Sequence, residues 1–288
     1  MKVLLTGASG FIGRNISAAL TTQGHEVVPV SRRHGVDFAQ MQAPACWLPY
    51  LDGVGAVVNC VGIIGPRGSQ CFNTLHTIAP SALFTACAQV GVRRVVQISA
   101  LGADNAAFSA YHRSKRDADD HLRSLDLDWF VLRPSLIYGR GGTSADLLLR
   151  LARLPLIPVI AGGQQPLQPV HISDVVAAVL QSISAPQTRL TLDVAGSQIF
   201  SFIHWLDLMR KAQGLAPGRF VSIPFALAMA GTRLGRPISP MLQPDNLRML
   251  QAGYQCDIEA FARFLGRMPL VVEPDLFFSD ATLKRGQS

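Results

Sequence analysis

The chain has 288 residues, of which 49% are hydrophobic and 16% are charged, and its formal net charge is +7. This length permits one large domain or two smaller ones, and the composition excludes a disordered chain. The positive charge could serve an anionic partner, but no basic run is interleaved with aromatic residues, so nucleic-acid binding is not expected.

Short β-rich runs alternate with helical patterns along the first half of the chain. This alternation predicts an α/β fold in which a Rossmann-type doubly wound parallel sheet carries helices on both faces. The predicted strands are residues 2–5, 26–30, 36–38 (a short stub), 56–60, 94–98 and 129–132, and the predicted helices are 11–23, a segment ending near 90, 110–125 and 174–183.

The sequence changes in character after Gly139, where prolines crowd residues 155–169. A further strand is predicted at 190–194. We therefore expect a sheet domain over residues 1–196, with 141–170 contributing to a small, mostly helical C-terminal cap that residues 197–288 complete. The most lipid-like segment, IPFALAMAG at 223–231, is expected to be a buried helix because its flanks are poor in Lys and Arg.

The glycine-rich segment TGASGFIG, residues 6–13, separates the first predicted strand from the first predicted helix. Gly7 would permit a tight turn, Gly10 would let a pyrophosphate approach backbone N–H groups, and Gly13 would let the helix pack closely on the strand. The positive end of the helix dipole would add to the attraction. A merely tight turn is the alternative, but the β-α-β context favours a dinucleotide site.

The end of the second predicted strand indicates which dinucleotide is bound. An NAD site commonly has Asp or Glu there, whereas this chain has Ser31, Arg32 and Arg33. A hydroxyl and guanidinium groups would bind a 2′-phosphate instead. The sequence therefore predicts NADP(H) as the preferred cofactor, with NAD(H) as the alternative; a solvated basic turn is the other interpretation.

The segment AYHRSKRDADDHL places Tyr111 and Lys115 one turn apart on one face of a predicted helix. A nearby ammonium would lower the pKa of the tyrosine, which could then exchange a proton with a carbonyl or an alcohol. The same spacing is also common on solvated helix faces. Arg113 and Arg116 lie off this stripe and are expected to pair in solvent with Asp117, Asp119 or Asp120.

Six segments carry a resemblance to a known family: TGASGFIG (6–13), VVNCVG (57–62), VVQISALGA (95–103), YHRSK (111–115), LRPSLIYG (132–139) and PVHISDVV (169–176). Through them the chain resembles the short-chain dehydrogenase/reductase superfamily, and in particular its extended and atypical NAD(P)-binding members. Within that group it resembles bacterial relatives of the NAD(P)H-binding accessory subunit of respiratory complex I. The resemblance covers nearly the whole chain.

The resemblance implies roles for individual residues. Tyr111 would be the acid/base, and Lys115 would hold the nicotinamide ribose. The other implied cofactor contacts are Gly7, Ser9, Gly10, Phe11, Ile12 and Gly13 around the pyrophosphate, Ser31, Arg32 and Arg33 at the 2′-phosphate, Asp37 and Phe38 beside the adenine, Cys60, Val61 and Gly62 beneath the adenosine ribose, Ser99, and Pro134 with Ile137 beside the nicotinamide.

Two positions depart from the pattern of this family. Active members carry a Ser or Thr just beyond the fifth strand, and that place falls on Ala100 or Leu101 here, with Ser99 one or two residues early. A shift of one residue turns a strand side chain to the opposite face, so packing is favoured over catalysis for Ser99. His76 stands where many extended members have an asparagine, and we expect it to hydrogen-bond structurally.

Three functions remain open at this stage. The Tyr111/Lys115 pair favours an NADP(H)-dependent oxidoreductase that moves hydride between the nicotinamide and a small carbonyl, alcohol or quinone-like substrate. The missing hydroxyl favours a low-turnover NAD(P)H-binding protein that assembles with a respiratory or other membrane-associated complex. A nucleotide-sugar epimerase or dehydratase ranks last, because the cap lacks an obvious uridine-diphosphate motif.

The five cysteines are scattered and none forms a C-x-x-C pair, so no disulfide framework and no metal site are expected. This usage fits a reducing cytoplasm, with peripheral association at the inner face of a membrane as an addition. The sequence has no signal-peptide pattern and no apolar run long enough to span a bilayer. It leaves the substrate and the oligomeric state open.

Overall fold

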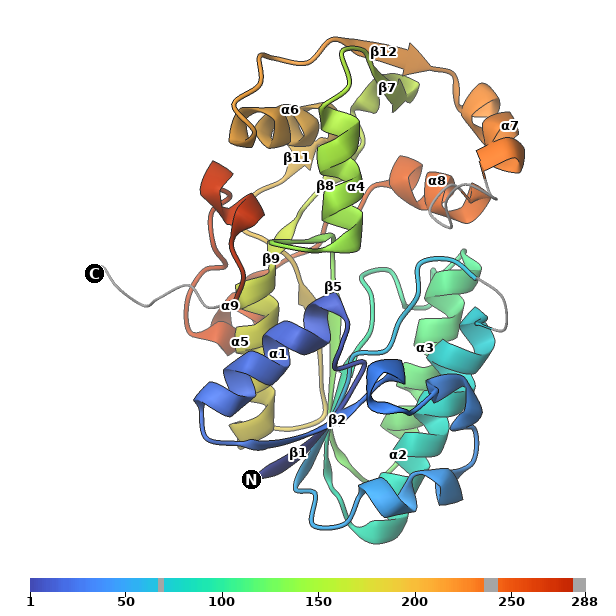
Figure 1. Ribbon diagram of the computed structural model, residues 1–288, viewed down its shortest axis with the longest axis vertical. Helices are drawn as coiled ribbons and strands as arrows, with labels where there is room; N and C mark the ends of the chain where they lie inside the picture. The colour runs from blue at the N-terminus through green and yellow to red at the C-terminus, as the bar shows by residue number, and fades with distance from the viewer. Residues whose placement is uncertain (67–69, 236–242, 282–288) are drawn as a thin grey trace. The chain divides into compact units, whose positions relative to one another are not determined.

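The computed structural model, drawn in Figure 1, describes residues 1–66, 70–235 and 243–281. The chain folds into two compact units. The first comprises Met1–Pro134 with Val175–Val194, and the second comprises Ser135–Asp174 with Ala195–Ser288. The prediction assigned 141–170 to the cap, and in the structure the second unit also includes the flanking residues 135–140 and 171–174.

The first unit is built on a six-stranded parallel sheet in the order β10-β5-β4-β3-β1-β2. Figure 1 shows α1 and α5 on one face of this sheet and α2 and α3 on the other, which confirms the predicted doubly wound fold. Its strands are β1 (Lys2–Thr6), β2 (Glu26–Val30), β3 (Ala56–Asn59), β4 (Arg94–Ile98), β5 (Asp128–Pro134) and β10 (Leu190–Val194). Its helices are α1 (Phe11–Thr22), α2 (Ala79–Val90), α3 (Ala110–Ser124) and, from Val175 onward, α5 (Ile172–Ser184).

The central strands β3 and β4 each contain a pair of adjacent valines without polar alternation, as expected where helices cover both faces of a sheet. Val57, Val58, Val95 and Val96 are all fully buried. Burial of such a side chain contributes about 1.5–3 kcal/mol, so these strands fix the position of the loops at their carboxyl ends.

The predicted stub at 36–38 is wrong. Residues Arg32–His34 and Phe38–Gln40 form 3-10 turns; Gly35, in the left-handed conformation with φ 78°, ends the first, and the Asp37 side chain caps the second. Phe38 packs on Trp47 in the core rather than pairing with a strand. As a result, β2 is an edge strand of the sheet, and it contains Pro29.

The second unit packs helices around a core that includes Tyr138, Trp205 and Phe277. Its helices are α4 (Thr143–Ala152), α6 (Phe202–Ala212), α7 (Phe225–Gly235), α8 (Pro244–Ala252) and α9 (Glu259–Leu265). Its strands form three two-stranded pairs, β6 (Ile137–Tyr138) with β9 (Val170–His171), β7 (Ile157–Ile160) with β12 (Phe220–Ile223), and β8 (Pro166–Leu167) with β11 (Phe200–Ser201).

The segment 223–231 corrects a second prediction, because it is not a buried helix. It spans the end of β12 and the start of α7, and within it Leu227 is 64% exposed. Ala226 and Ala230 are exposed too, and none of the side chains from 223 to 231 is fully buried. None of the described helices is both long and apolar enough to cross a bilayer.

Candidate functional site

The glycine turn at the end of β1 has the geometry that its sequence predicts. Gly7 has φ 68°, and a Cβ there would lie 2.9 Å from both the carbonyl carbon and the oxygen of Cys60. A Cβ on Gly13 would lie 2.2 Å from the carbonyl oxygen of Gly7. These two glycines therefore allow the turn to lie directly against the end of β3 and allow α1 to begin directly on the turn.

The N-terminus of α1 is open to an anion. Gly10 is the N-cap residue and makes no side-chain capping bond, and the first turn contains no acidic residue. The N–H groups of such a first turn lack intrahelical partners, and the helix dipole favours negative charge there. Gly10 is exposed, while Ser9, Phe11 and Ile12 are half-buried. This cradle fits a pyrophosphate. Because residue 10 is glycine, no side chain at that position obstructs the approach of a ligand.

The end of β2 forms a basic turn. Ser31 is buried and its Oγ lies 2.7 Å from Nδ1 of His34, while Arg32, Arg33 and His34 are all exposed. The hydroxyl and the guanidinium groups named by the sequence analysis thus occur on one short turn. His34 was not predicted as part of this turn, although its place next to the two arginines in SRRHG was a signal for it.

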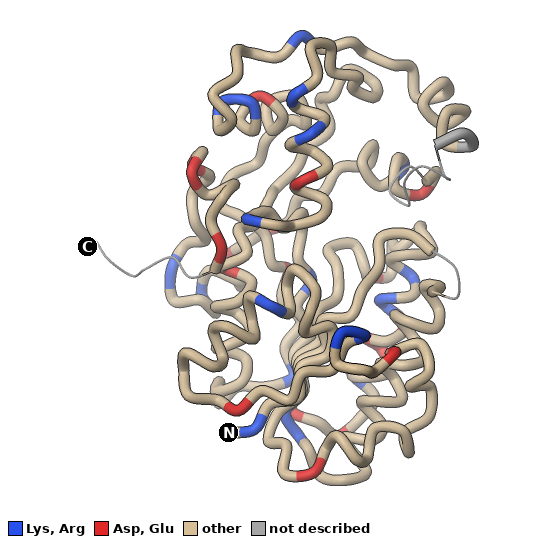
Figure 2. Tube along the Cα trace, viewed as in Figure 1, with Lys and Arg blue, Asp and Glu red and all other residues tan. Residues whose placement is uncertain are grey.

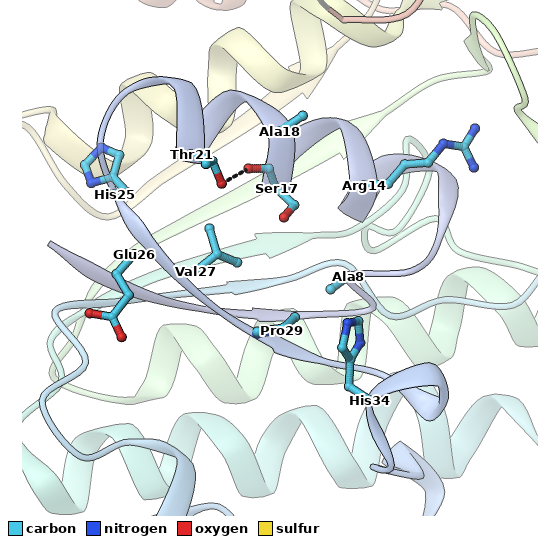
Figure 3. Close-up of a pocket in the computed structure, with 10 residues that line it drawn as sticks. All are labelled: Ala8, Arg14, Ser17, Ala18, Thr21, His25, Glu26, Val27, Pro29 and His34. Atoms are coloured by element: carbon cyan, nitrogen blue, oxygen red, sulfur yellow. Dashed lines mark hydrogen bonds between the residues drawn. The ribbon is translucent and has the colours of Figure 1, made fainter.

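A surface pocket of about 650 Å³ lies between α1 and β2. Figure 3 shows that Ser17, Ala18 and Thr21 line it from the helix, and that Val27 and Pro29 line it from the strand. One end reaches the carboxyl edge of the sheet, where it is lined by Ala8, Arg14 and His34, and the other end lies at His25 and Glu26. Only the first end adjoins the glycine turn and the basic turn.

Asp37 and Phe38 have local roles in the fold. Oδ1 of Asp37 accepts a hydrogen bond from the N–H of Ala39 at 3.1 Å and so caps the second 3-10 turn. Phe38 is 5% exposed, and its ring lies 5.3 Å from that of Trp47 in an edge arrangement. The ring of Phe38 thus belongs mainly to the core, which leaves little of it to border an adenine.

Lys115 is fixed at the carboxyl ends of two strands. Its buried Nζ donates to the carbonyl oxygen of Val61 at 3.0 Å and to that of Ile98 at 2.9 Å. A Cβ on Gly62 would lie 3.4 Å from this Nζ. Cys60 touches the glycine turn on one side, and Val61 and Gly62 touch Lys115 on the other. The structure therefore brings residues 60–62 between the phosphate cradle and Lys115.

Val61 is held in place by a chain of buried amides that crosses the sheet. Thr6 donates to Oδ1 of Asn59 at 2.5 Å, and the same oxygen accepts from the N–H of Val61 at 3.3 Å. Nδ2 of Asn59 donates to Oε1 of Gln97 at 2.7 Å. Asn59 is bonded on both sides by this buried chain, which restricts its motion, so the backbone at Val61 offers a fixed anchor for Lys115.

His76 makes the structural hydrogen bonds that were expected of it. It lies in a π-helical segment, Asn73–Ile78, that precedes α2. Its Nε2 accepts from the N–H of Ile63 at 2.9 Å, and its Nδ1 lies 3.0 Å from Oγ of Ser114. With Nε2 accepting, the ring carries its proton on Nδ1 and donates to Ser114. Burial, followed by the charge of Lys115, holds the pKa of His76 well below its usual value.

Tyr111 is half-buried among aromatic rings. Its ring lies 5.9 Å from Phe72, 5.4 Å from His76 and 5.2 Å from His112, each in an edge arrangement. Such contacts stabilise one orientation of the ring. The expected lowering of its pKa is wrong: burial, and secondarily the carboxylate of Asp119, raise the pKa of Tyr111 to about 12.

Burial lowers the pKa of Lys115 to about 8, against the opposing effects of Asp119 and Cys60. Because this value lies above neutrality, the ammonium form still predominates at pH 7. The thiol of Cys60 has its pKa raised to about 12 by burial and is therefore protonated. The site thus contains one buried cation next to a neutral phenol and a neutral thiol.

Asp119 is a second residue of the site that was not predicted. It is fully buried, and Oγ of Ser99 donates to its Oδ2. Burial raises the pKa of Asp119 to about 7 against the hydrogen bond from Ser99 and the charge of Lys115. Of the three aspartates expected to pair in solvent, Asp119 takes no part, and the expected pairing of Arg116 is confirmed with Asp117 and Asp120. Tyr111, Lys115 and Asp119 succeed one another at intervals of four, which was the available signal.

The hydroxyl of Ser99 is thus directed to Asp119, and its side chain is buried. Ala100 and Leu101, at the position where the family has its Ser or Thr, are buried and carry no hydroxyl. Pro134 ends β5 in the first unit, whereas Ile137 belongs to β6 in the second. Among the described residues, no three His, Cys, Asp or Glu side chains are grouped to hold a metal ion.

Comparisons with known proteins agree with this architecture. A family model described as the NAD dependent epimerase/dehydratase family matches residues 3–194. A ceramide reductase from Caulobacter vibrioides is 26% identical over 236 residues, which are 77% of this chain and 73% of that protein. The mitochondrial NADH dehydrogenase (ubiquinone) 1 alpha subcomplex subunit 9 from Arabidopsis thaliana is 27% identical over 249 residues, which are 78% of this chain but only 60% of that protein.

Solved structures show the same fold at low identity. MoeE5 in complex with UDP-glucuronic acid and NAD has a TM-score of 0.72 and 20% identity, with 98% of each chain covered. A dTDP-4-dehydrorhamnose reductase from Bacillus anthracis in complex with NADP has a TM-score of 0.64 and 16% identity, with 77% of this chain and 84% of that chain covered.

Proposed function

The chain belongs to the NAD dependent epimerase/dehydratase family, and from that premise we propose that it is an NADP(H)-dependent oxidoreductase. Its substrate is a small carbonyl or alcohol compound or a quinone-like molecule. The observation that carries the proposal is the anchoring of Lys115 on the carbonyls of Val61 and Ile98, one helical turn from Tyr111. This pair lies at the same sheet edge as the glycine turn.

The cofactor is held by groups with matching chemistry. The turn from Gly7 to Gly13 and the uncapped start of α1 hold the pyrophosphate. Ser31, with the exposed Arg32 and Arg33, holds the 2′-phosphate, and His34 adds a further donor there. Lys115 holds the nicotinamide ribose. NADP(H) is preferred over NAD(H) because no carboxylate stands at the end of β2.

When bound, the nicotinamide supplies or accepts the hydride. Tyr111 gives its phenolic proton to the oxygen of a substrate carbonyl and regains a proton from solvent. Because its pKa is raised to about 12, this phenol is protonated at neutral pH, which favours the direction of carbonyl reduction. The ammonium of Lys115 stabilises the phenolate that remains after the transfer. The relative described as a ceramide reductase is consistent with carbonyl reduction.

The cofactor assignment is tested by titrating the purified protein with NADPH and NADH. We expect NADPH to bind more tightly, and Ser31→Asp with Arg32→Ala to reverse that order. A matched control is Arg93→Ala, which removes an exposed arginine far along the sequence from the basic turn. Relative affinities that the double variant leaves unchanged would overturn the assignment.

Turnover is tested by following NADPH oxidation with a panel of carbonyl compounds, quinones and nucleotide sugars. Tyr111→Phe should abolish activity while leaving NADPH binding within about twofold, because only the transferred proton is lost. Tyr50→Phe, at a half-buried tyrosine in a 3-10 turn, should leave activity unchanged.

A second function is favoured by the state of Ser99. With that hydroxyl bonded to Asp119, no Ser or Thr at 99–101 is left to bond a substrate oxygen. The protein would then bind NADPH for stability and assemble peripherally with a membrane complex, as the similarity to a complex I subunit suggests. NADPH binding without turnover of any panel compound would favour this function.

A further inference from the structure

The second unit has two segments with a one-sided charge composition. Residues 147–163 and 208–224 together contain five Arg or Lys residues and no Asp or Glu. Figure 2 shows Lys and Arg positions at the end of α4, at the end of α6 and in the turn that leads to β12. Both segments also carry leucines, so their common surface is cationic and apolar.

A buried arginine joins these two segments. Arg210 of α6 is 9% exposed, and its guanidinium donates to the carbonyl oxygens of Ala152, Leu154 (3.2 Å) and Ala216 (2.7 Å). The segments meet again where the N–H of Ile157 donates to the carbonyl of Arg219 at 2.8 Å. We name residues 153–156 and 211–219 the cap tip. Its two parts are thus held side by side by main-chain anchors.

The cap tip presents leucines to solvent on this anchored backbone. Leu154 is 42% exposed, Leu156 is 58% exposed and Leu215 is 38% exposed. Because the carbonyls around them are bonded to Arg210, the loops are held in a conformation that keeps these side chains outside the core. A cluster of exposed apolar side chains on a fixed backbone is typical of an interaction surface rather than of incomplete packing.

The exposed charged side chains of the cap tip are all positive. Arg153, Lys211 and Arg219 are exposed, and none of them forms an ion pair with a described carboxylate. Arg153 donates only to the neutral amide of Gln213. The neighbouring acid, Asp207, is half-buried and accepts from the N–H of Gly218 at 2.9 Å. An anionic surface would therefore meet three cations and no exposed carboxylate of these segments.

We propose that the cap tip docks on the surface of an anionic lipid bilayer. Leu154, Leu156 and Leu215 enter the interface between head groups and acyl chains, while Arg153, Lys211 and Arg219 contact lipid phosphates. Leucines flanked by Lys and Arg match this chemistry, because apolar burial and attraction to anionic lipids act together. An apolar protein partner or a second copy of the chain would leave the three cations without a counter-charge.

The test is flotation of the full chain with vesicles of phosphatidylcholine, with and without about 30 mol% phosphatidylglycerol. We expect binding to the anionic vesicles at low salt, with or without NADPH, and weaker binding at about 500 mM salt. Leu154→Ser with Leu156→Ser should reduce the partition coefficient about tenfold or more. Val90→Ser with Met268→Ser, at two exposed apolar side chains elsewhere, is the matched control and should change it less than about twofold.

A charge variant provides an independent test that does not alter the leucines. Arg153→Gln, Lys211→Gln and Arg219→Gln together should reduce anionic-vesicle binding about a hundredfold at low salt and remove its salt dependence. Removing Arg93, Arg248 and Arg263 in the same way changes the net charge equally and should have a smaller effect. Circular dichroism and NADPH titration check that each variant is folded.

Three results would overturn the proposal. The first is that the wild type binds neither the neutral nor the anionic vesicles. The second is that the wild type and the variant Leu154→Ser with Leu156→Ser bind anionic vesicles equally well. The third is a dimer, seen by light scattering, that the leucine variant dissociates and that does not bind vesicles. That result would assign the cap tip to contact between copies of the chain.

Discussion

Substitution of Gly13 by alanine tests how closely α1 lies on the glycine turn. A Cβ there would lie 2.2 Å from the carbonyl oxygen of Gly7, and 2.8 Å from both its carbonyl carbon and Cα of Ala8. A carbon and an oxygen need roughly 3.2 Å, so the first turn of α1 would have to move by about 1 Å. All three neighbours are backbone atoms, which cannot change rotamer to relieve the contact.

The cost of this movement can be set against the benefit of alanine in a helix. Overpacking of a tight contact costs about 1–3 kcal/mol, and backbone neighbours favour the upper end of that range. Alanine in place of glycine stabilises a helix by about 0.5–1 kcal/mol. We therefore expect Gly13→Ala to lower the free energy of unfolding by about 2 kcal/mol, and to weaken NADPH binding because the N–H groups of α1 move.

Urea denaturation followed by tryptophan fluorescence measures this change, and NADPH titration measures the second effect. Gly231→Ala is a matched control: the residue lies in α7, and a Cβ there would meet no heavy atom within 4 Å. It should be neutral or stabilising by up to about 1 kcal/mol. If Gly13→Ala were as stable as the wild type and bound NADPH equally well, the close contact of α1 with the turn would be refuted.

Buried and exposed titratable groups give the remaining expectations. The pKa of Asp119 rises from 3.8 to about 7 on folding. Between these two pH values the folded state binds more protons than the unfolded state, so the free energy of unfolding falls as the pH rises from 3.8 to about 7. Relative to Asp119→Asn, the wild-type free energy of unfolding should fall by about 1.4 kcal/mol per pH unit between about pH 5 and 6.5, whereas a flat difference would contradict the burial. His76, whose pKa falls on folding, has the opposite slope but is common to both proteins and cancels. Iodoacetamide should label the exposed Cys71 first, because the Thr74 hydroxyl lowers its pKa. Cys60 and Cys87, with pKa values of about 12, should react only on unfolding. Peptide mass spectrometry measures the labelling of each cysteine, and equal labelling of all three in the folded protein would contradict this order.

The sheet and the glycine turn could be predicted from the sequence because their signals are local. Runs such as Ala56–Asn59 contain adjacent β-branched valines without polar alternation, which is typical of strands buried on both faces. Gly13 is required by its close contact with Gly7 in the same turn, and Gly7 by its close contact with Cys60 at the end of the adjacent strand β3. Residues 111 and 115 share a helix face for the same local reason.

Asp119 could not be placed in this way, because its burial depends on distant residues. The helix that carries it is rich in charged residues, and an aspartate there reads as part of the solvated face. Its partner Ser99 lies 20 residues earlier in the chain, on the loop after β4. Pairing across that distance is decided by how α3 packs on the sheet.

The two incorrect elements failed for tertiary reasons as well. Val36 and Phe38 alternate like strand residues, but both side chains belong to the core cluster that contains Trp47, and the backbone turns at Gly35. In α7, the apolar composition indicated burial, whereas the second unit covers it only partly. Composition specifies that a segment is apolar but does not specify what packs against it.

Because residues 36–38 do not form a strand, β2 lies at the edge of the sheet, which has a consequence for self-association of the protein. Among the residues that the structure describes, no strand pairs with the outer side of β2, so the sheet ends there in a row of main-chain groups onto which another chain could add. Pro29 has no N–H to offer an added strand, and proline is tolerated at such a border for that reason. This residue therefore makes growth of the sheet by a further copy less favourable, and Pro29→Val should increase the tendency of the protein to aggregate.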